Sequence, residues 1–182
     1  MTIALTGTPG TGKTTICHIL GKKYRIIDIN RMITDEGLHT GRDELRGSLV
    51  ADMEALQGRL DELVQGETVT IIIEGHLSHY LEGSDAVIVL RTRPGVLAQR
   101  LLDREYSKEK VRENMEAEAL DVILVEATQQ HDRVYEVETT ASSPEDAAIL
   151  VDSIIGHLSS GNFEQLDKYL PGQFDWSEEV FW

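Results

Sequence analysis

One stretch decides the fold that this sequence predicts: GTPGTGKT, at residues 7–14. It matches the pattern G-x-x-x-x-G-K-[ST], in which glycines let the loop curl until successive backbone N–H groups point inward at a phosphate. An apolar run at residues 3–6 precedes the loop, and a helical pattern over residues 13–22 follows it. A helix in that position adds its N-terminal dipole and its free donors. The arrangement predicts a site for a nucleoside triphosphate.

Two side chains at the end of this loop have separate expected roles. Lys13 would place a point charge between the β- and γ-phosphates. The Thr14 hydroxyl suits Mg²⁺, because this hard cation prefers oxygen ligands. The loop alone does not choose among a kinase, an ATPase and a GTPase. The sequence contains no Asn-Lys-x-Asp segment of the kind that reads guanine, which argues against a GTPase.

Strand-like and helix-like segments alternate along the whole chain, which is typical of α/β proteins. Apolar runs predict five strands, at residues 3–6, 25–29, 69–73, 86–90 and 134–137. Apolar periodicity and helix-start residues predict helices at residues 13–22, 52–64 and 108–130, and others that begin near Pro94 and Ser143. In the long helix over residues 108–130, the apolar stripe leaves Glu118 on the outer, polar face. Residues 30–47 show no clean period.

Length and composition bound the class of protein. With 182 residues, of which 41% are hydrophobic, the chain is long enough for one domain with a real core. No apolar run approaches the roughly 18 residues of a membrane helix, and the N-terminus does not read as a signal peptide. The single cysteine, Cys17, cannot form an internal disulfide and fits a reducing cytoplasm. We therefore expect a cytoplasmic protein and, by default, a monomer.

The net charge of −15 limits the expected partners. Nucleic-acid phosphates would be repelled, so we expect no direct DNA binding. The charge itself has two open interpretations. It could serve only solubility, for example in a salt-rich cytoplasm, or it could steer a basic partner such as a ribosomal protein.

An acid and a histidine follow the strand predicted at residues 69–73. Glu74 ends that strand, where an acid that coordinates a Mg²⁺-bound water is expected. It could reach the metal through water, act as a base, or be an ordinary solvated acid at a strand end. His76 could orient or deprotonate a nucleophilic water, or hold its loop by hydrogen bonds. For His79, three residues further on, we expect a structural role.

A short charged segment at residues 104–110 separates two predicted helices. Arg100 and Arg104 lie four residues apart, on one helix face. A flap at this point could close over ATP, bring Arg104 to its phosphates and exclude water. The alternative is an ordinary surface turn. The presence of the phosphate loop favours the flap.

Residues 160–182 form a C-terminal appendage to a domain that spans residues 1–159. The last nine residues contain four aromatic residues, although the whole chain is only 5% aromatic. They are Phe174, Trp176, Phe181 and Trp182. The appendage could pack back on the domain. It could also be a docking tail, because exposed aromatic side chains are costly unless a partner covers them.

With these segments assembled, the sequence resembles the adenylate kinase isoenzyme 6 family, the coilin-interacting nuclear ATPase type, in its archaeal form. The resemblance rests on TGTPGTGKTT at 6–15, EGHLSH at 74–79, VLR at 89–91, REY at 104–106, residues 114–127, and DW at 175–176. It spans essentially the whole chain. It implies a P-loop nucleoside monophosphate kinase fold, with a parallel five-stranded sheet flanked by helices. It also implies an acceptor-nucleotide region near residues 28–49 and a short lid near residues 103–113.

The resemblance also implies an activity and the residues that perform it. The implied chemistry is ATP + AMP → 2 ADP, together with ATP hydrolysis tied to small ribosomal subunit assembly. The residues implied to bind ATP are Gly10, Thr11, Gly12, Lys13, Thr14, Thr15 and Arg104. The residues implied to act in catalysis are Lys13, Glu74, His76 and Arg104. Mg²⁺ would be held by Thr14 and, through water, by Glu74.

The chain departs from the family pattern at two positions. The acid at residue 74 is more often Asp than Glu. Adenylate kinases usually hold the acceptor phosphate with an Arg on the first helix of the acceptor region, where this chain has Thr34. Other arginines could substitute, so the expected AMP-binding residues are Asp28, Arg31, Arg42 and Arg46.

Three functional hypotheses remain open at this point. The first is phosphoryl transfer from MgATP to AMP. The second is an ATPase that remodels a basic ribosomal protein, with Glu74 and His76 ordering a water in place of AMP. The third is a binding module that holds ATP only as a structural ligand. The first two hypotheses are compatible with each other.

Overall fold

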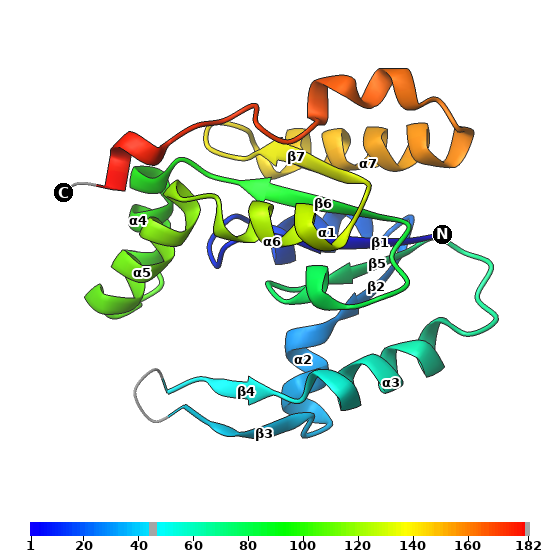
Figure 1. The fold of residues 1–182 in the computed structure, drawn as a ribbon, viewed down its shortest axis with the longest axis horizontal. Helices are drawn as coiled ribbons and strands as arrows, with labels where there is room; N and C mark the ends of the chain where they lie inside the picture. Colours follow the sequence, from blue (N-terminus) through cyan, green and yellow to red (C-terminus); the bar gives the residue numbers. More distant parts are fainter. Residues whose placement is uncertain (44–46, 181–182) are drawn as a thin grey trace.

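A five-stranded parallel sheet forms the centre of the protein (Figure 1). The computed structural model describes residues 1–43 and 47–180, and within them the order of the strands in this sheet is β2-β5-β1-β6-β7. The strands are β1 (Thr2–Thr6), β2 (Arg25–Asp28), β5 (Ile71–Glu74), β6 (Ala86–Arg91) and β7 (Val134–Glu138). The predicted fold class and all five predicted strands are confirmed, with ends that differ by one or two residues.

Helices cover both faces of this sheet, which is why its central strands are apolar on both sides. On one face, Ile3 and Leu5 of β1 pack against α1 (Lys13–Leu20) and α7 (Pro144–Ser160). On the other face, Ala4 packs with Leu124 of α6 (Val122–Gln130). The carboxyl ends of β1 and β5 meet at one edge of the sheet, where Leu5 pairs with Glu74. Ligands bind at this edge in open α/β sheets.

The chain between β2 and β5 forms a separate layer, at the bottom of Figure 1. It consists of α2 (Ile29–Asp35), the hairpin strands β3 (His39–Arg42) and β4 (Leu49–Ala51), and α3 (Met53–Val64). Ile29 of α2 and Leu56 of α3 share a cluster with Ile73 of the sheet. The predicted helix over residues 52–64 is confirmed. The hairpin was not predicted, because its strands are short and β3 is exposed along its whole length. The hairpin therefore shows no alternation of apolar and polar residues.

The single helix predicted over residues 108–130 is wrong. Over these residues the chain forms two helices, α5 (Lys108–Ala119) and α6, and the break between them falls at Asp121, whose φ of 57° is left-handed. The helix predicted to begin near Pro94 is confirmed as α4 (Pro94–Leu102). The outer position predicted for Glu118 is also wrong, because this residue is only 3% exposed. Glu118 and Asp121 both pair with the buried guanidinium of Arg91 at the end of β6. The turn at Asp121 separates α5 from α6, and Leu124 and Ala127 of α6 pack on the sheet.

The described part of the C-terminal appendage packs back on the domain. It contains the 3₁₀ segments η2 (Phe163–Tyr169) and η3 (Ser177–Val180), and a further one, η1 (Ser78–Tyr80), follows β5. Leu166 is buried in the core that α7 covers. Near the end of the described chain, Arg93 Nε donates to Glu179 Oε1 at 2.7 Å. Phe181 and Trp182 lie outside the described residues. No helix in residues 1–43 and 47–180 is both long and apolar enough to cross a membrane.

Candidate active site

The loop between β1 and α1 can only be built with glycine at its tightest points. Gly7 has a φ of 138° and Gly10 a φ of 98°, values that side-chain-bearing residues rarely adopt. A Cβ at Gly7 would lie 2.5 Å from the carbonyl oxygen of Leu90, and a Cβ at Gly10 would lie 2.8 Å from Leu97 Cδ1. The loop therefore packs directly on β6 and α4.

Lys13 lies buried against the loop that precedes it. Its Nζ donates to the carbonyl oxygens of Gly7, at 2.6 Å, and of Thr8, at 3.1 Å. Burial lowers the pKa of Lys13 to about 8, although the carboxylates of Glu74 and Glu118 oppose this shift. At neutral pH the side chain is therefore still mostly charged, and a phosphate that enters the loop can replace the carbonyls as its partner.

A cavity of about 380 Å³ opens over the loop. The predicted residues that line it are Gly10, Gly12, Lys13, Thr14, Thr15, Glu74, His76 and Arg104. Three further lining residues were not predicted: Pro9, Asn30 and Tyr106. Thr11 does not line this cavity but a second one of about 260 Å³, which shares Gly10, Gly12, Thr15 and Arg104 with the first. All four residues implied to act in catalysis thus face one cavity.

Glu74 and Thr14 form a polar pair at the floor of the cavity. The Thr14 hydroxyl donates to Glu74 Oε1 at 2.7 Å. Burial raises the pKa of Glu74, the bond from Thr14 opposes this, and the charge of Asp28 on the neighbouring strand adds to it. No group of three or more His, Cys, Asp or Glu side chains that could hold a metal exists among the described residues. A hydroxyl and a carboxylate suit Mg²⁺, which takes few protein ligands and completes its shell with phosphate oxygens and water.

The two histidines after β5 have different surroundings. His76 lines the cavity, and burial, together with the charge of Lys13, lowers its pKa to about 4. At neutral pH its imidazole is therefore uncharged and can accept a hydrogen bond. His79 is buried away from the cavity, with Nδ1 3.0 Å from Thr6 Oγ1 and Nε2 3.2 Å from Glu126 Oε2. This is the structural role expected for His79.

None of the expected AMP-binding residues that the structure describes lines this cavity. Asp28 ends β2, and its Oδ1 accepts the backbone N–H of Arg31 at the start of α2. The Arg31 side chain pairs with Asp35 at 3.0 Å on the exposed side of the helix. Arg42 lies exposed on β3, and Arg46 lies outside the described residues. Among the described residues, Asn30 is the α2 side chain that reaches the cavity, and no sequence pattern had marked it.

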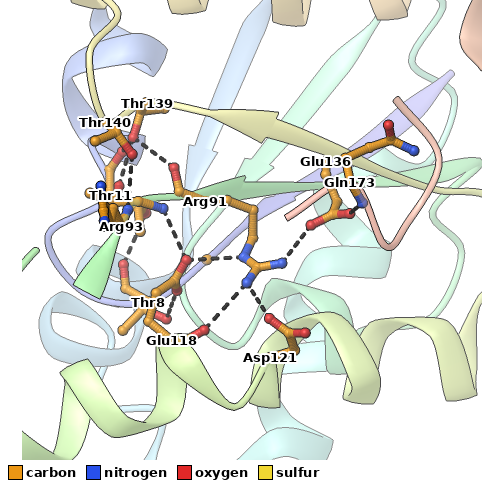
Figure 2. Close-up of polar contacts among 12 residues, drawn as sticks. Thr8, Thr11, Arg91, Arg93, Glu118, Asp121, Glu136, Thr139, Thr140 and Gln173 are labelled. Carbon is orange, nitrogen blue, oxygen red and sulfur yellow. Dashed lines mark hydrogen bonds and ion pairs between the residues drawn. The ribbon is translucent and has the colours of Figure 1, made fainter. Parts of the chain in front are cut away.

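One group of residues behind the loop was missed entirely. Figure 2 shows the buried guanidinium of Arg91 surrounded by the carboxylates of Glu118, Asp121 and Glu136. Glu118 also accepts a hydrogen bond from the Thr8 hydroxyl of the loop, at 2.5 Å. The available signal was an arginine at the end of an otherwise apolar strand, because such a charge must find buried partners.

Comparisons with known proteins agree with this geometry. A family model described as an AAA domain matches residues 3–121. A protein of Methanosarcina barkeri named "Putative adenylate kinase" is 49% identical over 99% of this chain and 100% of its own length. A protein of the same name from Archaeoglobus fulgidus is 43% identical over 99% of this chain and 94% of its own. The crystal structure of shikimate kinase from Bacteroides thetaiotaomicron superposes with a TM-score of 0.56 at 19% identity, over 86% of this chain and 98% of that one.

A phosphate loop that opens a parallel sheet, with a lysine, a hydroxyl and an acid at one cavity, defines a P-loop protein of the α/β class, and its fold is shared with a kinase of known structure. Within that class, the chain belongs to the AAA-domain family and, inside it, to the archaeal proteins named "Putative adenylate kinase".

Proposed function

We propose that the protein transfers the γ-phosphoryl group of ATP to AMP, giving two ADP, and that it also hydrolyses ATP. The observation that carries this proposal is the meeting of Lys13, the Thr14–Glu74 pair and Arg104 at one cavity. Phosphoryl transfer needs little covalent chemistry from a protein, since positioning and charge stabilisation supply most of the catalysis. This cavity offers both.

The two adjoining cavities suggest where each part of ATP would lie. The phosphates would lie on the N–H groups of the loop, in the larger cavity, beside Lys13. The base and ribose would extend into the second cavity, between Arg100 and the segment that starts α7 at Ser143. Gly12 and Arg104 line both cavities, so a single extended nucleotide can span them.

The chain's own residues would then divide the work of the transfer. Lys13 would turn from the loop carbonyls to the phosphates, and Arg104 would add a second positive charge as negative charge spreads in the transition state. The segment 103–113 would act as the lid, because it carries Arg104 and Tyr106 over the cavity and can exclude water. Mg²⁺, held by the Thr14 hydroxyl and through water by Glu74, would supply charge neutralisation between the β- and γ-phosphates.

The acceptor would enter from the layer formed by residues 28–49. Asn30 lies at the cavity, and Asp28 ends the neighbouring strand. The acceptor phosphate needs a cation, for which Arg31, Arg42 and Arg46 are the candidates of this region. We propose AMP as the acceptor on the strength of the names of the relatives and of the resemblance to adenylate kinases.

Hydrolysis is the second candidate activity, and His76 favours it. Its uncharged imidazole lies at the same cavity as Lys13, where it can accept a hydrogen bond from a water and orient that water when no acceptor is bound. The Glu74-Gly75-His76 segment also supports the finer assignment to the isoenzyme 6 type, a cytoplasmic ATPase of small-subunit ribosome assembly. The charge of −15 would then attract a basic ribosomal protein.

Incubation with MgATP and each nucleoside monophosphate, followed by separation of the nucleotides, tests the proposal. We expect AMP to be consumed with the formation of two ADP, and ATP to decline slowly without any monophosphate. Loss of ATP while AMP stays intact would overturn the transferase and leave the ATPase. Association with a basic ribosomal protein that depends on ATP and weakens with salt would support the assembly role, and its absence would count against it.

A further inference from the structure

The phosphate loop is hydrogen-bonded to one buried carboxylate, that of Glu118. Thr8 Oγ1 donates to Glu118 Oε2 at 2.5 Å, and both side chains are almost completely buried. The other oxygen, Glu118 Oε1, accepts from Arg91 Nε at 3.0 Å and from the backbone N–H of Thr92 at 2.9 Å (Figure 2). Both oxygens of Glu118 are therefore held in fixed directions.

Arg91 supplies the positive charge that a buried carboxylate needs. It is only 1% exposed, and its guanidinium also meets Asp121 and, at 2.5 Å, Glu136 Oε2. Burial alone would lower the pKa of Arg91, but Glu118 and Asp121 reverse the effect and raise it. Because all three partners come from different elements, the guanidinium fixes Glu118 relative to the sheet.

Thr8 is the residue of the loop on which several other contacts converge. Its carbonyl oxygen accepts from Thr11 N at 3.2 Å, from Thr11 Oγ1 at 2.9 Å and from Lys13 Nζ at 3.1 Å. A side chain anchored at Thr8 thus fixes the turn that aims the following N–H groups and Lys13. The anchor lies in the last turn of α5, the helix that continues the charged segment after Arg104.

We propose that Glu118 is a positioning residue for the phosphate loop, acting through the Thr8 hydroxyl, with Arg91 holding Glu118 in place. This inference rests on the proposed use of the loop for ATP. Glu118 lines neither of the two cavities, and its effect is to keep the loop aligned before ATP arrives, which lowers the cost of binding. A merely structural tie between α5 and β6 would instead affect stability and leave ATP binding by the folded protein unchanged.

A double-mutant cycle separates these two readings. Thr8→Val removes the hydroxyl with little change of shape, and Glu118→Gln removes the charge but keeps an acceptor for Arg91 and Thr92. Each should weaken ATP binding and lower kcat/KM for MgATP, by about tenfold for Thr8→Val. The double variant should bind ATP about as weakly as the more strongly affected single variant, because both changes act on the same hydrogen bond between Thr8 and Glu118. Thr8→Ser, which keeps the hydroxyl, should lie between wild type and Thr8→Val.

Glu116→Gln is the matched control. It removes the same charge from the same helix, where Glu116 pairs with Arg112 at 3.1 Å on the surface, and ATP binding should stay at the wild-type value. Effects of Thr8→Val and Glu118→Gln that simply multiply, or ATP affinities equal to that of Glu116→Gln, would overturn the inference. If Thr8→Val does not fold, the comparison of Glu118→Gln with Glu116→Gln decides alone. A wild type that neither binds nor consumes ATP would instead refute the proposed function.

Discussion

The two sides of the cavity differ in how deeply their polar side chains are buried. On the side of the phosphate loop, Thr8, Lys13 and Glu118 are buried and hydrogen-bonded to one another or to the backbone. On the side of α2, Arg31 lies on the surface and pairs locally with Asp35. Buried contacts of the first kind align a site in advance, whereas exposed pairs of the second kind hold little energy. Substitutions on the two sides should therefore differ greatly in effect.

The largest effect is expected from Arg91→Met. The change leaves Glu118 and Glu136 buried without their cation, which should cost about 3–5 kcal/mol of folding free energy. Urea unfolding followed by circular dichroism measures it. The control Arg112→Met alters an exposed arginine of similar size and should leave the curve almost unchanged. A loss below about 1 kcal/mol for Arg91→Met would refute the buried network as the anchor of this side.

The next largest effect concerns activity and not stability. Lys13→Met should lower kcat/KM for MgATP by about 10² to 10³-fold, since one preorganised charge at the transferred phosphoryl group is lost. The folded state should persist, because the substitution removes a buried amine whose charged form burial disfavours. Steady-state kinetics beside a thermal melt checks both parts. A variant that melts far below wild type would show that Lys13 holds the loop together structurally.

The pH dependence of ATP binding provides a third, smaller effect. In the free protein Lys13 releases its proton as the pH rises through about 8, and bound phosphates would raise that pKa. Above this pH, binding must take up a proton, so the affinity should fall by up to tenfold per pH unit; below it the Lys13 contribution is constant. Calorimetric titrations between pH 7 and 9.5 measure the change. The Lys13→Met variant should lack this fall.

The smallest effects should come from the acceptor side. Arg31→Ala breaks an exposed pair on α2 and should shift the Tm by less than about 2 °C. ATP affinity should be unchanged, because Arg31 does not line the cavity over the loop. The KM for AMP, measured in the same variant, then reports whether this arginine is recruited by the acceptor. A large loss of ATP binding would break the contrast between the two sides.

The same contrast explains what could be predicted from the sequence. The loop and the five strands could be predicted because each is a local pattern: glycines at fixed spacing, or a short run of apolar residues. The turn at Asp121 and the burial of Glu118 depend on Arg91, about 30 positions earlier in the chain, and helical periodicity counts an acid as exposed. The hairpin strands gave no apolar alternation, because β3 is exposed along its whole length and β4 has only three residues. Asn30 reaches the cavity only because α2 starts at the end of β2.

The central claim is that the loop holds a nucleoside triphosphate, and equilibrium titration of the folded protein with MgATP at pH 7 tests it most directly. The account predicts saturable binding at one site per chain, weakened at least a hundredfold in Lys13→Met. A wild-type protein that is folded by circular dichroism yet binds no MgATP, or binds it as well after Lys13→Met, would contradict the account.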